Sequence, residues 1–328
     1  MRLIGFAVIL SASLTLTSLA AEGQQKGKVY RVGILDPGHE PQPYSTIPGY
    51  GPFRQSLADS GYVEGRNVSF AYRWGGGDFR ILPALAIELV RVGVDVLFAV
   101  STPAIRALMG ATTTIPIVVV SVLDPIDAGM VASLARPGGN ITGVSGRVIE
   151  LNEKLLELLK ESKPSVSRVA VFGHPTAVGR DRQGMEAAAR RLRVQLQFLE
   201  VTSLKGLDEA FESAAKARAE GLVLLPTELF AFNERRIAGL ALERRLPTIF
   251  WRSQFAEAGG LMAYGPDDVY ALQRAGALVA RILAGARPSD LPVEQVDRFR
   301  LVLNLKTAKA LGLTIPPTIL LRADQVIE

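Results

Sequence analysis

Short apolar runs alternate with helical patterns along this chain, and the alternation occurs in two successive series. Runs that are apolar at nearly every position are typical of strands buried on both faces, as in parallel sheets covered by helices. The strands expected in the first series are YRVGIL (30–35), NVSFAYR (67–73), VDVLFAV (94–100) and TIPIVVVSVL (114–123), with helical patterns at 52–61 and 81–93. This order predicts a doubly wound α/β sheet.

The second series begins after a glycine-rich break and has the same character. Its expected strands are RVAVFG (168–173), VQLQFLE (194–200), GLVLLP (221–226), PTIFW (247–251) and FRLVLNL (299–305), and its expected helices are 149–162, 180–192, 204–219, 229–244 and 268–284. The predicted fold class is therefore α/β, with two Rossmann-like, doubly wound parallel-sheet lobes.

Three Gly- and Pro-rich breaks interrupt the pattern, at 135–146, 256–267 and 285–295. Two lobes in simple succession need only one connection, so three breaks predict that the chain crosses between the lobes three times. We expect the first lobe at 29–144 plus 260–287 and the second at 147–256 plus 292–328. The hinges are then expected near 144–147, 256–260 and 287–292.

The first 21 residues have the pattern of a secretory signal peptide. One positive charge, Arg2, precedes an apolar run at 3–10, and small residues at Ser18 and Ala20 suit cleavage after Ala20 or Ala21. The alternative is a membrane anchor, which the five Ser and Thr residues between positions 11 and 18 disfavour. We expect a periplasmic or otherwise exported protein that is soluble after cleavage.

Composition and motifs exclude several classes of function. The chain has no Cys, which rules out disulfides, thiolate metal sites and lipid attachment at a cysteine. The formal charge is +5, but the densest basic run, 180–193, is interleaved with Ala on an expected helix and indicates a solvated face. No HExxH, G-x-S-x-G, P-loop or early G-x-G-x-x-G sequence occurs. We therefore expect no nucleic-acid partner, no metal, no cofactor and no enzymatic activity.

Polar side chains gather where the expected strands end. Ligands of open α/β sheets bind outside the carboxyl ends of the strands. Hydroxyl groups and helix N–H groups would hold a carboxylate, an acidic side chain would hold an amine, and an aromatic side chain would stack on an apolar group. The candidate ligand-binding residues are Asp36, Ser101, Thr102, Ser121 and Asp124 in the first lobe, and His174, Thr227, Glu228, Trp251 and Ser253 in the second.

Most of these candidates have a purely structural alternative. Ser101 and Thr102 could only cap the helix that Pro103 begins. Asp124, which precedes a proline, could only fix a turn. Trp251 could belong to the core, and His174, like His39, could be an ordinary loop residue.

Several long segments resemble one family. They include SLADSGYVEGRNVSFAYRW (56–74), TTTIPIVVVSVLDPIDAGMVASLARPGGNITGVS (112–145) and the C-terminal stretch from 283 to 328. These segments are similar to the ABC-transporter substrate-binding proteins of the TrpX-like group, some of which are associated with aromatic amino acids. The resemblance implies the type I periplasmic binding protein fold, with three crossovers and a ligand in the cleft between the lobes. It points to Ser101, Thr102 and Asp124 as cleft positions.

The function expected from these observations is binding without chemistry. A small polar or zwitterionic solute, such as an amino acid, would be captured between the lobes of a monomer and delivered to an ABC permease driven by its ATPase. Two alternatives remain open at this point. One is a sensory partner that presents its ligand to a membrane receptor, and the other is an exported α/β enzyme that uses the same cleft.

Overall fold

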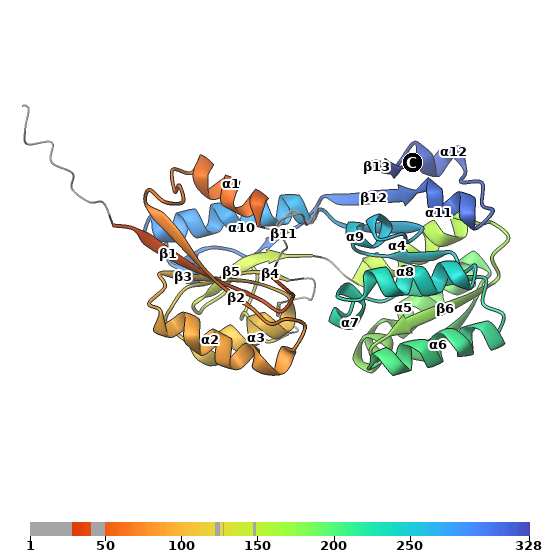
Figure 1. The fold of residues 1–328 in the computed structure, drawn as a ribbon, viewed down its shortest axis with the longest axis horizontal. Coiled ribbons are helices and arrows are strands. Elements are labelled where there is room, and N and C mark those ends of the chain that lie inside the picture. Colours follow the sequence, from red (N-terminus) through yellow and green to blue (C-terminus); the bar gives the residue numbers. More distant parts are fainter. Residues whose placement is uncertain (1–27, 41–49, 122–124, 127, 147–148) are drawn as a thin grey trace, which may run out of the picture.

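The computed structural model describes residues 28–40, 50–121, 125–126, 128–146 and 149–328. The predicted signal peptide and the candidate residue Asp124 lie outside this part of the chain. Figure 1 shows two α/β lobes side by side, the first built mainly from the N-terminal half and the second mainly from the C-terminal half. The predicted fold class is confirmed.

The first lobe is built on a parallel sheet in the order β11-β5-β4-β3-β1-β2. Its strands are β1 (Tyr30–Asp36), β2 (Val68–Trp74), β3 (Val96–Val100), β4 (Ile117–Ser121), β5 (Ile141–Ser145) and β11 (Glu294–Gln295). Its helices are α1 (Gly51–Asp59), α2 (Leu82–Arg91), α3 (Thr102–Ala111) and α10 (Asp268–Leu283), with the 3-10 turns η1 (Phe79–Ile81) and η2 (Pro288–Asp290).

Side-chain alternation along β1 explains why helices cover both faces of this sheet. Val32 and Ile34 pack in one cluster with residues of α1 and α10, whereas Leu35 packs in another with residues of α2 and α3. Successive residues of a strand point to opposite faces, so an apolar run of this kind needs cover on both sides.

The second lobe has a sheet in the order β13-β12-β10-β9-β8-β6-β7. All of its pairs are parallel except β10 with β12, a difference from the fully parallel sheet expected. Its strands are β6 (Arg168–Gly173), β7 (Gln195–Glu200), β8 (Gly221–Leu224), β9 (Thr248–Phe250), β10 (Met262–Pro266), β12 (Phe299–Asn304) and β13 (Gln325–Ile327). Its helices are α4 (Ile149–Ser162), α5 (Pro175–Leu192), α6 (Leu204–Lys216), α7 (Glu228–Ala231), α8 (Glu234–Glu243), α9 (Ser253–Glu257), α11 (Leu305–Ala310) and α12 (Pro317–Leu320).

Two of the predicted lobe boundaries are wrong. Residues 262–266 form β10 of the second sheet, so the second crossing follows Pro266 and does not lie at 256–260. The Gly259-Gly260 pair only ends α9, because Gly259 has a φ of +107°. Likewise β11 pairs with β5 of the first sheet, which moves the third crossing from 287–292 to the stretch between Gln295 and Phe299.

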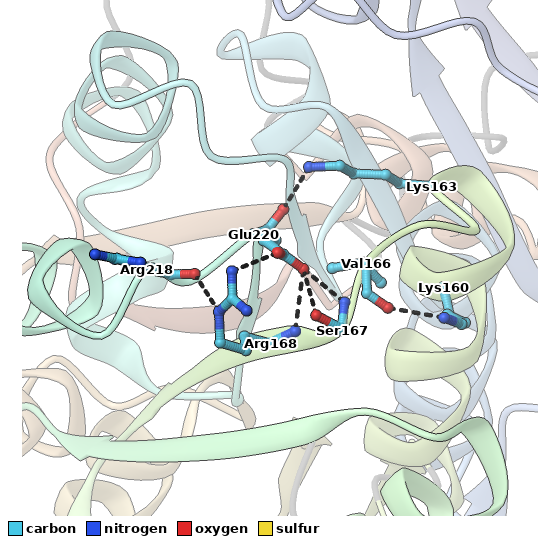
Figure 2. A network of polar contacts seen from close by, with 7 residues as sticks. All are labelled: Lys160, Lys163, Val166, Ser167, Arg168, Arg218 and Glu220. Atoms are coloured by element: carbon cyan, nitrogen blue, oxygen red, sulfur yellow. Dashed lines mark hydrogen bonds and ion pairs between the residues drawn. The ribbon is translucent and has the colours of Figure 1, made fainter.

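A polar network around Glu220 joins the amino ends of β6 and β8 (Figure 2). The Glu220 carboxylate accepts hydrogen bonds from Ser167 N at 2.6 Å, Arg168 N at 3.3 Å and Arg168 Nη2 at 2.5 Å. Lys163 Nζ donates to the Glu220 carbonyl at 3.1 Å. The network lies at the opposite end of the sheet from the carboxyl ends that precede the candidate residues, so its role is to hold the second lobe together.

Candidate functional site

The segments that follow β3 and β8 meet between the lobes. Thr102 N, in the first residue of α3, donates a hydrogen bond of 3.3 Å to Oε1 of Glu228, the first residue of α7. The two residues are 126 positions apart in the sequence. This contact places two of the predicted site residues together across the interlobe boundary. We call these two residues, together with Asp36, Ser101, Trp251 and Arg252 at the ends of neighbouring strands, the interlobe site.

Ser101 has an unusual backbone and an unused hydroxyl. Its φ of +85° and ψ of 145° lie in a region that is nearly restricted to glycine. Its side chain does not cap α3, and its buried Oγ has no hydrogen-bond partner among the described residues. A cap alone therefore does not explain this residue, since both the strain and the unused hydroxyl are typical of a binding site.

Asp36, the last residue of β1, is held from two sides within the first lobe. Its Oδ1 accepts a hydrogen bond of 2.6 Å from Gly38 N, and its Oδ2 accepts one from the Tyr50 hydroxyl. Burial raises the pKa of Asp36, although Tyr50, Gly38 and the charge of Arg252 in the second lobe oppose the rise. The loop that follows Asp36 also approaches the second lobe, because a Cβ atom built on Gly38 would lie 3.3 Å from the Phe232 ring.

Aromatic rings lie beside Asp36. Tyr50 stacks with Tyr72 at 6.4 Å and with Trp74 at 6.2 Å between ring centroids, and Tyr72 and Trp74 are stacked at 5.8 Å with an interplanar angle of 6°. Tyr72 and Trp74 are two positions apart on β2, so they share one face of the sheet. The first lobe thus has a stacked aromatic group next to a carboxylate, and Tyr50 and Tyr72 of this group also pack against the core of the lobe.

The second lobe contributes Trp251 and Arg252, directly after β9. The Trp251 side chain is buried, with 7% of its surface exposed, and its Nε1 has no hydrogen-bond partner in the described part of the chain. The Arg252 guanidinium lies over the Trp251 ring, 5.5 Å from the centroid, and its Nε is 2.8 Å from Glu234 Oε1. Trp251 therefore serves the core and also carries an unused donor.

Carboxyl groups surround Arg252. Burial raises the pKa of Glu234 to about 7, although the Arg252 charge opposes this. Burial also raises the pKa of Asp268, whose carboxylate accepts a hydrogen bond of 3.2 Å from Gln254 Nε2. Gln254 belongs to α9 of the second lobe and Asp268 begins α10 of the first, so this hydrogen bond spans the second crossing.

Two half-exposed phenylalanines meet at the rim of the interlobe site. Phe79 of η1 and Phe232, which follows α7, have ring centroids 5.8 Å apart. A Cβ atom built on Gly38 would lie 3.3 Å from the Phe232 ring, so the Asp36 loop also approaches this side chain closely. Apolar contact between the lobes therefore adjoins the polar contact of Thr102 with Glu228.

The remaining candidates have other roles or positions. His174 is exposed and caps α5, with Nδ1 2.8 Å from Thr176 Oγ1. Thr227 caps α7 by accepting a hydrogen bond of 3.2 Å from Phe230 N. Ser121 is buried at the end of β4, opposite Ser145 of β5, and Ser253 begins α9. Within the described residues, no hydrogen bond or ion pair joins His174, Thr227 or Ser253 to the opposite lobe.

Several residues of the region were not among the candidates. Arg252 and Glu234 form an ion pair that no sequence motif marks. The aromatic surface could have been found, because Phe70, Tyr72 and Trp74 alternate along β2 with the spacing of one strand face. Tyr50 joins them only through the fold.

No group of three or more His, Cys, Asp or Glu side chains in the described residues could hold a metal ion. Within the same residues, every helix is too short or too polar to cross a bilayer.

Comparison with known proteins adds a family to this geometry. The family model described as ABC transporter substrate binding protein matches residues 43–327. A tyrosine-binding protein from Clostridioides difficile (strain R20291) is 27% identical over 263 residues, which are 80% of this chain and 75% of that protein.

Solved structures agree with the family match. A conserved domain protein from Vibrio cholerae is 28% identical with a TM-score of 0.79, over 91% of this chain and 100% of that one. An ABC domain from Streptococcus pneumonia in complex with L-Trp is 25% identical with a TM-score of 0.81, over 92% and 100%. A ligand-free, open substrate binding protein with adhesive properties from Clostridium difficile, also 25% identical, has a TM-score of 0.67 over 91% and 99%.

Proposed function

This chain belongs to the ABC transporter substrate-binding proteins, and from that premise we propose that it captures an aromatic amino acid between its two lobes and delivers it to an ABC permease. The observation that carries the proposal is the meeting of the α3 N-terminus with Glu228 across the lobes. One wall offers N–H and hydroxyl donors, and the other offers a carboxylate. A zwitterion has the complementary pair of charges.

The α-carboxylate of the solute binds at the start of α3. Thr102 N and the Ser101 hydroxyl are its donors, and the positive end of the helix dipole favours negative charge there. The α-ammonium of the solute binds Glu228 and, on the first-lobe side, approaches Asp36. This arrangement gives both formal charges of the solute a partner, which a site closed off from water requires.

An aromatic side chain on the solute is supported by the walls of the site. Trp74 and its stacked neighbours provide a ring surface on the first lobe, and Trp251 provides a buried ring with an unused donor on the second. Offset stacking and edge-to-face contacts with such rings favour an aromatic guest over an aliphatic one. Two relatives, a tyrosine-binding protein and an ABC domain in complex with L-Trp, agree with this ligand class.

Capture requires the lobes to move and delivery requires a membrane partner. We propose that the exported monomer binds its solute on the first lobe, closes through bending at the three crossings, and presents the closed form to the permease without changing the solute chemically. The solute can favour closure only by its differential affinity for the closed form. The TM-score is higher to the L-Trp complex than to the ligand-free, open relative at equal identity, which supports a closed arrangement here.

A thermal-shift screen tests the proposal. A solute that binds only the folded protein stabilises it by about 2.7 kcal/mol at a hundredfold excess over Kd. We expect L-tyrosine, L-tryptophan or L-phenylalanine to raise the melting temperature of the mature protein, and L-leucine and D-ribose to have little effect. The bound compound should be recovered unaltered, which mass spectrometry of the released solute checks.

The matched variant for this screen is the double substitution Ser101→Ala with Thr102→Ala. It removes both hydroxyl groups of the α3 N-terminus and should erase the shift at modest ligand excess. A shift that persists would return Ser101 and Thr102 to a structural role. A screen in which no amino acid stabilises the protein would overturn the ligand class.

A further inference from the structure

The Glu228 side chain already accepts a hydrogen bond from Thr102 N, the donor to which the proposed function assigns the solute carboxylate. Its Oε1 accepts the Thr102 N–H at 3.3 Å, and Glu228 is half-buried at the start of α7. One N–H group cannot serve two carboxylates fully, so the side chain of the second lobe and the α-carboxylate of a solute occupy the same place in turn.

The surroundings of Thr102 N are typical of an anion-binding site. Helix α3 has ten residues, so its N-terminus carries a developed dipole. The adjacent Ser101 Oγ is buried without a partner among the described residues, and the strained Ser101 backbone fixes the orientation of the turn. A carboxylate at Thr102 N therefore has a second donor within the same turn.

We infer that Glu228 is an internal competitor for the carboxylate site, and that this competition makes the interlobe site selective for solutes that carry an amine. This inference rests on the proposed function and adds a selection rule to it. A solute carboxylate that takes Thr102 N displaces the Glu228 side chain. The displaced carboxylate then lies beside the solute carboxylate and needs a positive partner.

An α-amino acid supplies that partner itself. Its ammonium group is attached to the carbon next to its carboxylate, so it reaches the displaced Glu228 without further movement. A simple carboxylic acid has no such group, and it leaves two like charges close together in a partly buried site. Arg252 of the second lobe does not relieve this repulsion, because it is paired with Glu234 at 2.8 Å.

Two probes that differ only in the amine test the inference: L-tyrosine and 3-(4-hydroxyphenyl)propanoate. We expect calorimetry on the wild type to give a much weaker Kd for the propanoate. In Glu228→Ala the propanoate should bind about tenfold more tightly than in the wild type, the size expected for removing one competing charge-assisted hydrogen bond. L-Tyrosine should bind no more tightly in this variant, because it loses its ammonium partner.

Two further variants control for folding and for net charge. Glu228→Gln keeps the shape of the side chain and should also tighten propanoate binding. Glu212→Gln removes the same charge from an exposed position on α6 and should leave both Kd values unchanged. Propanoate binding that is unchanged or weaker in both Glu228 variants would overturn the inference.

An experiment without solute separates this inference from the proposed function. If the wild type binds neither probe, the aromatic ligand class fails, and amide hydrogen exchange then decides the inference. The Thr102 amide should exchange faster in Glu228→Ala than in the wild type and in Glu212→Gln. An unchanged rate would mean that Glu228 does not occupy this donor in solution, and the inference would fall.

Discussion

Arg252 Nε lies 2.8 Å from Glu234 Oε1 in an ion pair that joins the end of β9 to the start of α8. Only 26% of the Arg252 side chain and 12% of the Glu234 side chain are exposed. Burial outweighs the attraction of the arginine, and it raises the pKa of Glu234 to about 7. The charge of this buried pair therefore changes close to neutral pH.

Glu234→Gln should flatten the dependence of stability on pH. A carboxyl with a raised pKa binds more protons in the folded than in the unfolded protein, so stability is present at low pH and is lost as the pH rises from about 5 to about 8. The loss attributable to Glu234 is roughly 3 kcal/mol at most. Melting temperatures across this range should fall in the wild type and fall less in Glu234→Gln.

The residual slope in that variant should come from Asp36 and Asp268, whose pKa values burial also raises. Glu243→Gln is the matched control, because Glu243 lies on the same helix with 73% of its side chain exposed. Equal slopes in the wild type and Glu234→Gln would show that this carboxyl titrates in its ordinary range.

Ser101→Gly should make the protein more stable and a poorer binder. Glycine adopts a φ of +85° without strain, so the substitution should add about 1 kcal/mol to the free energy of unfolding. It also removes the buried hydroxyl that the proposed function gives to the solute carboxylate. Chemical denaturation and calorimetry with L-tyrosine measure the two effects on the same preparation.

Arg193→Gly is the control for Ser101→Gly. Arg193 has a φ of +56° at the end of α5 and takes no part in the interlobe site, so glycine there should stabilise the fold without weakening binding. If Ser101→Gly binds the solute as tightly as the wild type, the Ser101 hydroxyl takes no part in binding and the strained backbone only shapes the turn.

Phe232→Ala should favour the open arrangement of the lobes. The Phe79–Phe232 contact at 5.8 Å is an aromatic pair between the lobes, and such pairs contribute about 0.5 to 1.5 kcal/mol beyond their buried area. Small-angle X-ray scattering should give a larger radius of gyration, and solute affinity should fall about threefold to tenfold. Phe79→Ala should change the radius of gyration and the affinity in the same way. The double variant should then differ little from either single variant.

Leu321→Ala is the control for the aromatic pair, because Leu321 is exposed at 87% and lies on the second lobe away from Phe79. Additive effects of Phe79→Ala and Phe232→Ala on affinity would mean that the two rings act separately and not as an interlobe contact.

The fold class could be predicted because strands buried on both faces have a strong local signal. The lobe boundaries could not, since Gly and Pro mark turns whether or not the chain changes lobe there. The break at Gly259-Gly260 is a turn within the second lobe, whereas the actual crossing after Pro266 is short and continues directly into α10. Sheet membership depends on pairing partners that are distant in sequence.

Only part of the candidate site could be predicted, because strand ends have a local signal in the sequence and tertiary partners do not. Strand ends indicate Asp36, Ser101, Thr102, Glu228 and Trp251, because each follows an apolar run directly or within a few residues. The partnership of Arg252 with Glu234 and the meeting of Phe79 with Phe232 depend on tertiary contacts. The expected helix 229–244 is also interrupted at Phe232-Asn233, where α7 ends and α8 begins.

Glu220→Gln should weaken the fold and leave solute binding unchanged. Hydrogen bonds from Ser167 N, the Ser167 hydroxyl and Arg168 N lower the pKa of the Glu220 carboxyl. A lowered pKa contributes stability that is complete near neutral pH and is lost as the pH falls below about 5. Because several charge-assisted hydrogen bonds lose their charged acceptor, the free energy of unfolding at pH 7 should fall by about 2 kcal/mol.

The pH series and a surface control make that expectation specific. The difference between wild type and Glu220→Gln should shrink in acid, because the wild-type carboxyl is then protonated as well. Glu161→Gln removes an exposed partner of Arg322, 2.6 Å away, and should cost less than about 1 kcal/mol. If the two variants lose equal stability at pH 7, the backbone hydrogen bonds of Glu220 add nothing beyond a surface ion pair, and the amino ends of β6 and β8 must be held together by their apolar packing alone.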